Sequence, residues 1–583
     1  MNKVVIINKD KCNPVKCGGY ICMSFCPRNR AGDECIVKAG EKIAINEEVC
    51  ISCGICVKKC PFNALRVINT PKELSKDPIH QFSKNSFRLY GLPIPKSDQV
   101  IGLLGGNGIG KSTAIQILNG DFKPNLGRYD QTVSDSEIIA YFQGTEAHDF
   151  ISKSLKGELS TSYKPQYVEA IPKNYKGTVK QLLTKISPGF HSIVEELSLI
   201  KLLDTPINKV SGGELQRIAI AATILKKANT YFFDEPSSYL DIKQRLRVAA
   251  KLRGLKSISS QVFIVEHDLI MLDYMTDLIH VFFGEPGAFG ITSHPYSTRE
   301  GINHYLKGEL PSENLRFRDK PIVYDLTGAE SAIKREVINS WSESSVKLGN
   351  FSLKVLPGEL REGEVVGILG ENGIGKTTFA RLLTGELEPD KGVIDSELKI
   401  SYKPQYIKPE SDQLVKDLLI NNSLFSKFKH YFRHLSINSL MNKSLKQLSG
   451  GELQRVSIVN CLTKEADIYL LDEPSAHLDV EQRIHAAKAL KDITRAMKKN
   501  AIVIDHDLMF IDYVCERLIV FTGEPAIKGL AQGPYSMRVG MNLFLKELNL
   551  TFRRDDATNR PRPNKLGSVK DREQKTKGEY YYT

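Results

Sequence analysis

The sequence has little cysteine outside its first 60 residues and no long uninterrupted apolar run. Only two of its 11 cysteines, Cys461 and Cys515, lie beyond residue 60. No apolar stretch reaches the roughly 18 to 20 residues that a membrane-spanning helix needs, and the N-terminus lacks the apolar core of a secretion signal. These absences argue against a membrane protein and against a disulfide-stabilised secreted protein. We therefore expect a cytoplasmic protein with no membrane partner.

The overall composition is that of an ordinary globular protein. Of 583 residues, 41% are apolar and 25% are charged, and a chain of this length holds several domains at roughly 150 residues each. Lys and Arg outnumber Asp and Glu by 80 to 68, which gives a net charge of +12. This excess gives weak support to a polyanionic partner such as nucleic acid.

Nine cysteines are concentrated in the first 60 residues. The stretch C-I-S-C-G-I-C-V-K-K-C-P from Cys50 to Pro61 has the spacing of bacterial-type [4Fe-4S] sites, in which the fourth cysteine ligates a second cluster. A looser copy from Cys12 to Pro27 ends in the same C-x3-C-P. With crossed ligation, the two predicted sets are Cys26, Cys50, Cys53 and Cys56 for one cluster and Cys12, Cys17, Cys22 and Cys60 for the other.

Zinc and a disulfide knot are the alternatives for this segment. Zinc sites favour paired C-x2-C knuckles over a triple run, and a disulfide knot conflicts with the missing secretion signal. Cys35 is a ninth thiol where eight complete two clusters. Since Ile36 and Val37 follow it, we expect Cys35 to be a buried strand residue and not a ligand.

The rest of the chain contains one set of motifs twice. The phosphate-loop pattern G-x4-G-K-[ST] begins at Gly105 and again at Gly370, each time between an apolar strand and a helical pattern. In such a loop, backbone N–H groups hold the nucleotide phosphates, the lysine reaches the terminal phosphates and the hydroxyl ligates magnesium. The predicted nucleotide-binding residues are Gly105, Asn107, Gly108, Gly110, Lys111, Ser112 and Thr113 in the first copy and Gly370, Asn372, Gly373, Gly375, Lys376, Thr377 and Thr378 in the second.

Further motifs recur at an offset of 238 or 239 residues. They are Y-K-P-Q-Y, S-G-G-E-L-Q-R, D-E-P after an apolar strand, and a histidine at the end of a further strand. A helix cap or a strand-to-loop junction explains any one of these motifs but not all of them in register, so the sequence indicates a duplicated ATP-hydrolysing unit. The candidate residues are Gln166, Ser211, Gly212, Gly213, Asp234, Glu235 and His267 in the first copy and Gln405, Ser449, Gly450, Gly451, Asp472, Glu473 and His506 in the second.

The chemistry of these residue types suggests their roles. The aspartate of D-E-P ends a buried strand and is expected to hold magnesium through water, while the adjoining glutamate polarises the attacking water. A buried carboxylate without such a use would be costly. The strand-end histidine is expected to contact the terminal phosphate, and a hydrogen-bonded structural histidine is the alternative. The helix that starts at S-G-G-E suits a phosphate, but each copy already has a phosphate loop, so this anion site must face the other copy.

On these motifs the chain resembles the ABC ATPases, in which two nucleotide-binding domains pack head to tail around two ATP molecules. The resemblance implies composite sites that join the first phosphate loop to Ser449 and Gly451 and the second to Ser211 and Gly213. It also implies that adenine stacks on an aromatic residue upstream of each phosphate loop. The candidates by position are Phe82, which could equally be a core residue, and Trp341, and the residues expected at magnesium are Ser112, Thr377, Gln166 and Gln405.

The class of ABC protein follows from what else is present. ABC transporters need membrane segments, and the chromosome-organising and repair members carry long coiled coils. The tandem ABC translation factors lack cysteine clusters. Over nearly its whole length the chain resembles the E subfamily, the ribosome-recycling or RNase L inhibitor family. Further matching segments are S-S-Y-L-D from Ser237, S-A-H-L-D from Ser475, the hinge segments 295–303 and 313–318, and the terminal segment 552–565.

The resemblance implies an α/β protein with two tandem nucleotide-binding domains packed head to tail, preceded by a ferredoxin-like α+β domain with two [4Fe-4S] clusters. We expect a monomer with an internal pseudo-dimer. The expected parts are residues 1–70 for the iron-sulfur domain, 71–292 and 326–530 for the two ABC domains, and 293–325 and 531–583 for the hinge segments.

The first copy is longer between its motifs. From the phosphate-loop lysine to the glutamine is 55 residues there and 29 in the second copy. The extra residues predict a helix–turn–helix at about 130–157, with a capping box from Ser134 to Glu137 and a turn at Gly144. The family contacts the small ribosomal subunit through such an insertion, and an inert surface elaboration is the alternative. The basic residues that could either brace the two halves or contact rRNA phosphate are Arg316, Arg318, Arg553, Arg554, Arg560, Arg562 and Lys565.

Three departures from the family pattern remove no ligand or catalytic group. The gap between Cys17 and Cys22 is one residue longer than expected, His477 replaces an expected tyrosine, and Gly106 follows Gly105 in the first phosphate loop.

The resemblance implies an ATPase that splits ribosomes after termination or stalling, together with a peptide-release factor or its Pelota-type paralogue. It would then stay on the small subunit toward initiation, where initiation factors are further possible partners. ATP-driven closure would press the iron-sulfur domain, tethered near residues 69–80, against the bound factor. The alternatives are an ATP-coupled redox enzyme and an ATP-gated scaffold in translation initiation.

Overall fold

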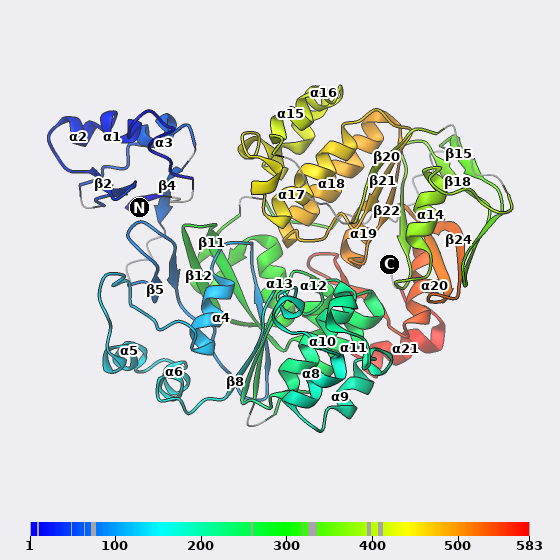
Figure 1. The fold of residues 1–583 in the computed structure, drawn as a ribbon, viewed down its shortest axis with the longest axis horizontal. Coiled ribbons are helices and arrows are strands. Elements are labelled where there is room, and N and C mark those ends of the chain that lie inside the picture. Colours follow the sequence, from blue (N-terminus) through cyan, green and yellow to red (C-terminus); the bar gives the residue numbers. More distant parts are fainter. Residues whose placement is uncertain are drawn as a thin grey trace.

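The computed structural model describes residues 2–7, 11–47, 49–62, 64–70, 77–257, 260–318, 320–324, 335–392, 398–405 and 412–581. A small N-terminal domain stands at one end, and two larger α/β domains lie beside each other (Figure 1). Residues 71–76 of the expected tether lie outside the described part. Among the described residues, no helix is both long enough and apolar enough to cross a membrane.

The N-terminal domain is built from short helices and two antiparallel strand pairs. Strand β1 pairs with β4, and β2 pairs with β3. Its apolar core includes Ile36, Ile43 and Ile45, all nearly fully buried. The elements are β1 (Asn2–Ile7), α1 (Ile21–Ser24), α2 (Pro27–Arg30), β2 (Ile36–Ala39), β3 (Lys42–Ile45), α3 (Ile55–Lys59) and β4 (Leu65–Thr70).

The first ABC domain is organised around an eight-stranded mixed sheet. Strands β11, β7, β10, β9 and β8 run parallel to their neighbours, and β12 returns antiparallel to β11. The central strands are continuous apolar runs because both of their faces are covered. The order across the sheet is β5 (His80–Gln81), β6 (Arg88–Tyr90), β12 (Phe289–Ser297), β11 (Leu278–Glu285), β7 (Val100–Leu104), β10 (Gln261–Val265), β9 (Thr230–Asp234) and β8 (Thr161–Lys164).

The second ABC domain repeats this sheet strand for strand, which confirms the duplication. Its final strand, like β12, hydrogen-bonds antiparallel to the strand before it. The expected boundaries at residues 292 and 530 are therefore wrong, because each falls inside a sheet strand, and the sheets end at Ser297 and Ser536. The order is β16 (Ser344–Leu348), β17 (Phe351–Val355), β24 (Lys528–Ser536), β23 (Arg517–Glu524), β19 (Val365–Leu369), β22 (Asn500–Ile504), β21 (Ile468–Asp472) and β20 (Ile400–Lys403).

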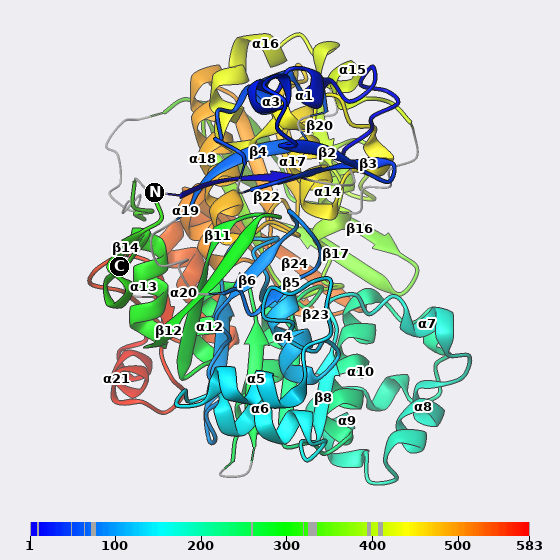
Figure 2. The ribbon, with the colours of Figure 1, turned by 90° about the vertical axis from the view of Figure 1, so that its left-hand side faces the viewer.

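The insertion in the first copy forms the predicted helix–turn–helix. Helix α5 (Asp135–Phe142) starts at the Ser134 capping box, and α6 (His148–Leu155) follows a turn in which Gly144 has φ +79°. One face of this pair is buried against the first domain. Figure 2 shows both helices at the far end of that domain from the N-terminal domain. The insertion is thus an outward-facing addition to the first sheet.

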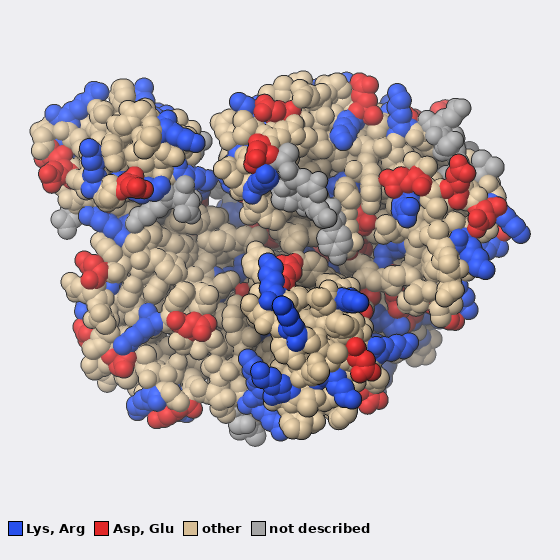
Figure 3. Space-filling view, viewed as in Figure 1, with Lys and Arg blue, Asp and Glu red and all other residues tan. Residues whose placement is uncertain are grey.

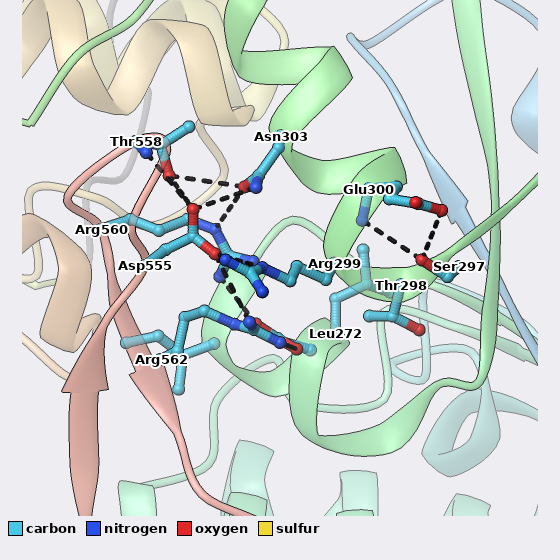
Figure 4. Close-up of polar contacts among 12 residues, drawn as sticks. Leu272, Ser297, Thr298, Arg299, Glu300, Asn303, Asp555, Thr558, Arg560 and Arg562 are labelled. Carbon is cyan, nitrogen blue, oxygen red and sulfur yellow. Dashed lines mark hydrogen bonds and ion pairs between the residues drawn. The ribbon is translucent and has the colours of Figure 1, made fainter.

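The C-terminal segment braces the two halves through buried arginines (Figure 4). Strands β25 (Phe552–Arg554) and β26 (Pro561–Pro563) lie against α12 (Leu269–Met275) and α13 (Thr298–Lys307) of the first domain. Arg560 is fully buried, and its Nη1 lies 2.7 Å from Asp273 Oδ2, which Arg562 Nε also reaches at 2.7 Å.

Two other arginines of the basic set are also engaged within the protein. Arg554 pairs with Asp512 of the second domain at 2.6 Å, and Arg318 lies 3.5 Å from Glu481 of the second domain. The basic set was expected either to brace the two halves or to contact rRNA phosphate. Four of its members brace the halves: Arg318, Arg554, Arg560 and Arg562.

Candidate functional site

The first phosphate loop closes around its own lysine. Helix α4 (Lys111–Asn119) begins directly after the loop, and Lys111 Nζ donates to Gly105 O at 2.8 Å and Gly106 O at 2.6 Å. Ser112 Oγ donates to Asp234 Oδ2 at 3.2 Å. The hydroxyl and the carboxylate predicted to share a magnesium ion are therefore adjacent.

The second phosphate loop holds its lysine in the same way. It leads into α14 (Lys376–Leu383), and Lys376 Nζ donates to Gly370 O and Glu371 O, both at 2.8 Å. Each lysine thus lies against loop carbonyls, in position to turn toward a bound phosphate.

The aspartates of the two D-E-P motifs are buried at the ends of β9 and β21. Burial, followed by the charge of the adjoining glutamate, raises the pKa of Asp234 to about 6 and that of Asp472 to about 7. Adjacent carboxylates removed from water repel each other, so a divalent cation between them and the nucleotide would restore both charges. The donor set of carboxylate, hydroxyl and phosphate oxygens is the one that Mg²⁺ prefers.

Each predicted water-activating glutamate is held by the predicted glutamine. Gln166 Nε2 donates to Glu235 Oε1 at 2.7 Å, and Gln405 Nε2 donates to Glu473 Oε1 at 2.7 Å. Both glutamates have positive φ, +48° and +47°, a strained backbone conformation that concentrates at functional sites. The two copies therefore aim the carboxylate in the same way.

The strand-end histidines join the same sites. His267 Nε2 lies 3.7 Å from Glu235 Oε1, and His506 Nε2 lies 3.8 Å from Glu473 Oε1. Burial, followed by the charge of the phosphate-loop lysine, holds the pKa of each histidine well below its usual value. A neutral imidazole beside the carboxylate can donate one hydrogen bond toward a terminal phosphate.

The structure adds two pairs of residues that the motif analysis did not single out. Lys164 Nζ donates to Asp234 O at 2.7 Å, and Gln216 Nε2 donates to Glu235 O at 2.7 Å. Lys403 and Gln454 make the corresponding contacts. They fix the backbone of the D-E pair. Their recurrence inside Y-K-P-Q-Y and S-G-G-E-L-Q-R was the available signal.

The two domains meet head to tail through the aspartates of S-S-Y-L-D and S-A-H-L-D. Asn372 N donates to Asp241 Oδ2 and Asn107 N donates to Asp479 Oδ2, both at 3.3 Å. Each aspartate therefore reaches the phosphate loop of the other domain.

The S-G-G-E loop packs behind the first of these aspartates. A Cβ on Gly213 would lie 2.7 Å from Tyr239 O, in the loop that ends at Asp241, and Ser211 caps α10 (Gly212–Leu225). Ser449 caps α17 (Gly450–Leu462) in the same way. Of these two groups, the aspartates make the hydrogen bonds to the opposite phosphate loop in the part of the chain that the structure describes.

One of the two predicted adenine-stacking residues, Trp341, needs correction. Trp341 is buried in the core, where it packs on Phe379 and donates from its indole N–H to Leu356 O, so neither ring face is free for adenine. Phe82 packs against His80 and Phe122 but is 48% exposed, so its role in adenine stacking stays a prediction. Two other aromatic residues, Phe87 and Phe351, lie against the phosphate loops, with ring atoms 2.6 Å and 2.9 Å from where a Cβ added to Gly110 and to Gly375 would lie.

The cysteines line two separate cavities in the N-terminal domain. Each cavity gathers one of the two sets predicted from crossed ligation: one is lined by Cys26, Cys50, Cys53 and Cys56, the other by Cys12, Cys17, Cys22 and Cys60. Among the described residues, no three metal-binding side chains converge on a single ion. Four thiols around a larger space fit a multi-iron cluster. Cys35 is buried as expected, but it precedes β2 instead of lying in a strand, and it also lines the first cavity.

The N-terminal domain contacts the first ABC domain through the β5–β6 hairpin, which carries Phe87. Asn85, in the turn between β5 and β6, accepts from Ile45 N at 2.8 Å and donates to Glu47 Oε1 at 2.9 Å. Arg66 pairs with Glu285 at 3.0 Å. The anchor and the phosphate-loop aromatic are therefore two residues apart.

Comparison with family models supports this architecture. The model described as ABC transporter matches residues 95–238 and 353–476. A 4Fe-4S binding domain model matches residues 43–66, and a model for a possible Fer4-like domain in RNase L inhibitor matches residues 3–34.

Individual proteins match over the whole chain. The Arabidopsis thaliana protein named ABC transporter E family member 1 is 44% identical, with 100% of this chain and 99% of that protein covered. A solved structure described as ribosome-bound archaeal Pelota and ABCE1 superposes with a TM-score of 0.94 at 47% identity, covering 100% of this chain and 99% of the other. An archaeal ribosome recycling factor aABCE1, in complex with ribosomal stalk protein aP1, has a TM-score of 0.81 at 48% identity, covering 87% of this chain and 99% of the other. The chain belongs to the RNase L inhibitor family of ABC ATPases, the E family.

Proposed function

We propose that the protein is an ATP-hydrolysing ribosome recycling factor that separates the subunits after termination or stalling. It works beside a release factor or Pelota-type protein and then stays on the small subunit. The observation that carries this proposal is the shared hairpin: Asn85 holds the N-terminal domain, and Phe87 lies against the first phosphate loop. The relatives described as ribosome-bound and as a recycling factor support it.

The ATP chemistry follows from groups present in both copies. Mg²⁺, held through Ser112 or Thr377 and the buried aspartates, would neutralise developing phosphate charge. Lys111 or Lys376 turns from the loop carbonyls to the terminal phosphates. Glu235 or Glu473, held by the motif glutamine, accepts the proton of the attacking water. The histidine then loses its partner as phosphate leaves.

Closure converts this chemistry into movement. Asp241 and Asp479 already bridge to the opposite phosphate loops, so ATP enters between two domains that are in contact. Tightening of the first site moves the 80–90 hairpin, and with it the N-terminal domain. Two [4Fe-4S] clusters in the two cysteine cavities would make that domain a rigid wedge.

The experiment is sucrose-gradient sedimentation of purified ribosomes with this protein, a release factor and ATP. Free subunits should appear only with ATP and the complete set of proteins. Intact ribosomes throughout would refute recycling and favour the scaffold alternative. The redox alternative predicts activity that depends on dithionite, whereas a wedge is indifferent to oxidation state as long as the clusters stay intact.

The insertion is proposed as the contact with the small subunit, since the second copy builds its ATP site without it. On the face shown in Figure 3, basic side chains are interspersed with acidic ones, so the charges on that face do not favour another surface over the insertion as the contact with rRNA. Residues 134–156 would be replaced by a short Gly-Ser linker. Intrinsic ATP hydrolysis should stay nearly unchanged while co-sedimentation with small subunits at constant salt weakens. Undiminished co-sedimentation would show that the insertion is an inert surface elaboration.

A further inference from the structure

Two largely buried arginines lie where the two ABC domains meet. Arg245 lies on α11 (Ile242–Arg253) and Arg483 on α18 (Val480–Met497), each four residues after the aspartate that crosses to the other domain. Their side chains are 14% and 16% exposed. The hydrolysis chemistry described above does not use either of them, yet both are held in one conformation by several acceptors.

Arg245 connects three points. Its Nη1 donates to Asp268 Oδ2 at 2.7 Å and to the carbonyl of His506 at 3.4 Å, and its Nε donates to Leu240 O at 2.8 Å. Asp268 directly follows His267, the histidine of its own domain. The guanidinium therefore bridges the histidine turns of both ATP sites.

Arg483 repeats the arrangement in the opposite direction. Its Nη1 donates to Asp507 Oδ2 at 2.6 Å and to the carbonyl of His267 at 3.3 Å, and its Nε donates to Leu478 O at 2.9 Å. The two bridges are related by the pseudo-symmetry of the duplicated domains.

The aspartates in these bridges are rigid parts of the histidine turns. Asp268 caps α12 and accepts from Ile270 N and Met271 N, and Asp507 caps α19 (Leu508–Val514) in the same way. The two capped helices, α12 and α19, contact each other across the interface, and burial and then the charge of Asp507 raise the pKa of Asp268 to about 6. Two carboxylates and two guanidiniums thus share one buried position, where breaking any bridge leaves a charge uncompensated.

We propose that Arg245 and Arg483 are positioning residues that couple the two ATP sites. Each one ties the histidine turn of its own domain to the histidine carbonyl of the other. When a terminal phosphate leaves one site and its histidine turn shifts, the arginine transmits the shift to the other turn. A lysine, which offers a single ammonium where these sites use a planar fork, cannot hold all three acceptors.

The test measures one site while perturbing the other. In the Glu473→Gln background only the site with Glu235 hydrolyses ATP, and His506→Ala lies in the silent site. We expect His506→Ala to change kcat at the active site at least fivefold with KM within twofold. With Arg245→Lys also present, the further effect of His506→Ala should fall below twofold. Arg247→Lys, on the same helix and bonded to Ser198, is the matched control and should leave the effect of His506→Ala intact.

The outcomes separate coupling from simpler explanations. An equal His506→Ala effect with and without Arg245→Lys would overturn the proposal, as would no effect at the distant site in either background. A merely structural role would lower the unfolding midpoint of Arg245→Lys without removing the dependence on His506. The proposal rests on the histidines as phosphate contacts. In the Glu235→Gln background only the site with Glu473 hydrolyses ATP. If His506→Ala leaves turnover at that site normal, the assignment of the histidine as a phosphate contact is wrong, whereas the bridge made by Arg245 is not refuted.

Discussion

Asp273→Ala, on α12 of the first domain, should loosen the junction between that domain and the C-terminal segment, because Asp273 is the partner of both Arg560 and Arg562. Burial raises the pKa of Asp273, but the charges of Arg560 and Arg562 outweigh it and keep the pKa below its usual value. Arg560 is fully buried, so removing its counter-ion strands a charge away from water. Stranding a buried charge costs about 3 to 5 kcal/mol. Arg562 keeps a second partner in Asp555 at 3.4 Å, which places the loss mainly on Arg560.

Hydrogen exchange of the Phe552, Asp555 and Asn564 amides, which are hydrogen-bonded around β25 and β26, measures this cost locally, because a chain of several domains does not unfold in one step. At about 1.4 kcal/mol per tenfold, exchange should speed up by about a hundredfold to a few thousandfold. Asp556→Ala is the control: this carboxylate is 90% exposed and pairs only at the rim with Arg299, a contact worth about 0 to 1 kcal/mol. Equal protection in both variants would refute the bracing role.

Three further predictions concern the metal and nucleotide sites. Purified protein should contain about eight iron and eight sulfide per chain, and Cys35→Ser should lose far less iron than Cys53→Ser. Zinc in place of iron would overturn the ligand sets. Glu235→Gln and Glu473→Gln should each keep ATP binding and lose hydrolysis at their own site, and the double variant should stay closed; hydrolysis at the unmutated rate would exclude these residues. The pKa of Asp472 is about 7 in the folded protein and roughly 4 in the unfolded chain. Between these two pH values the folded state therefore binds more protons than the unfolded state. The carboxyl group of Asp472 thus destabilises the nucleotide-free protein as the pH rises from about 4 to about 7. The thermal unfolding midpoint of Asp472→Asn should therefore rise relative to that of the wild type as the pH increases over that range. A difference between the two midpoints that does not depend on pH would contradict the raised pKa.

The ATP and cluster residues could be predicted from the sequence because their signals are local. Lys111, Ser112 and their loop glycines lie within eight residues, and the four cysteines of each set occur in two short runs. The duplication added a second check, since the four motifs after the phosphate loop recurred at an offset of 238 or 239 residues. Crossed ligation joined Cys26 to the second run, and the shared cavity agrees with that pairing.

The adenine side of the site could not be predicted in this way. Phe87 reaches the phosphate loop because β6, which follows it, pairs with β12, whose Phe289 is opposite Arg88. That contact joins residues about 200 apart, and nothing local distinguishes Phe87 from Phe82. The same limit applied to the arginines, because the burial of Arg560 depends on an aspartate 287 residues away.

The charges at the interface between the two domains explain why the first phosphate loop has a glycine at position 106. In the second phosphate loop the corresponding residue, Glu371, pairs across the interface with Lys243 at 2.7 Å. The counterpart of Lys243 in the second domain is Glu481, which instead pairs with the hinge residue Arg318 at 3.5 Å. A glutamate at position 106 would project toward Asp479, whose Oδ2 is 3.9 Å from the Cβ position there, with a second acidic residue nearby in sequence and no lysine to offset it. Like charges so placed repel, so the duplicated sites keep identical catalytic groups while the residues around them differ in sign.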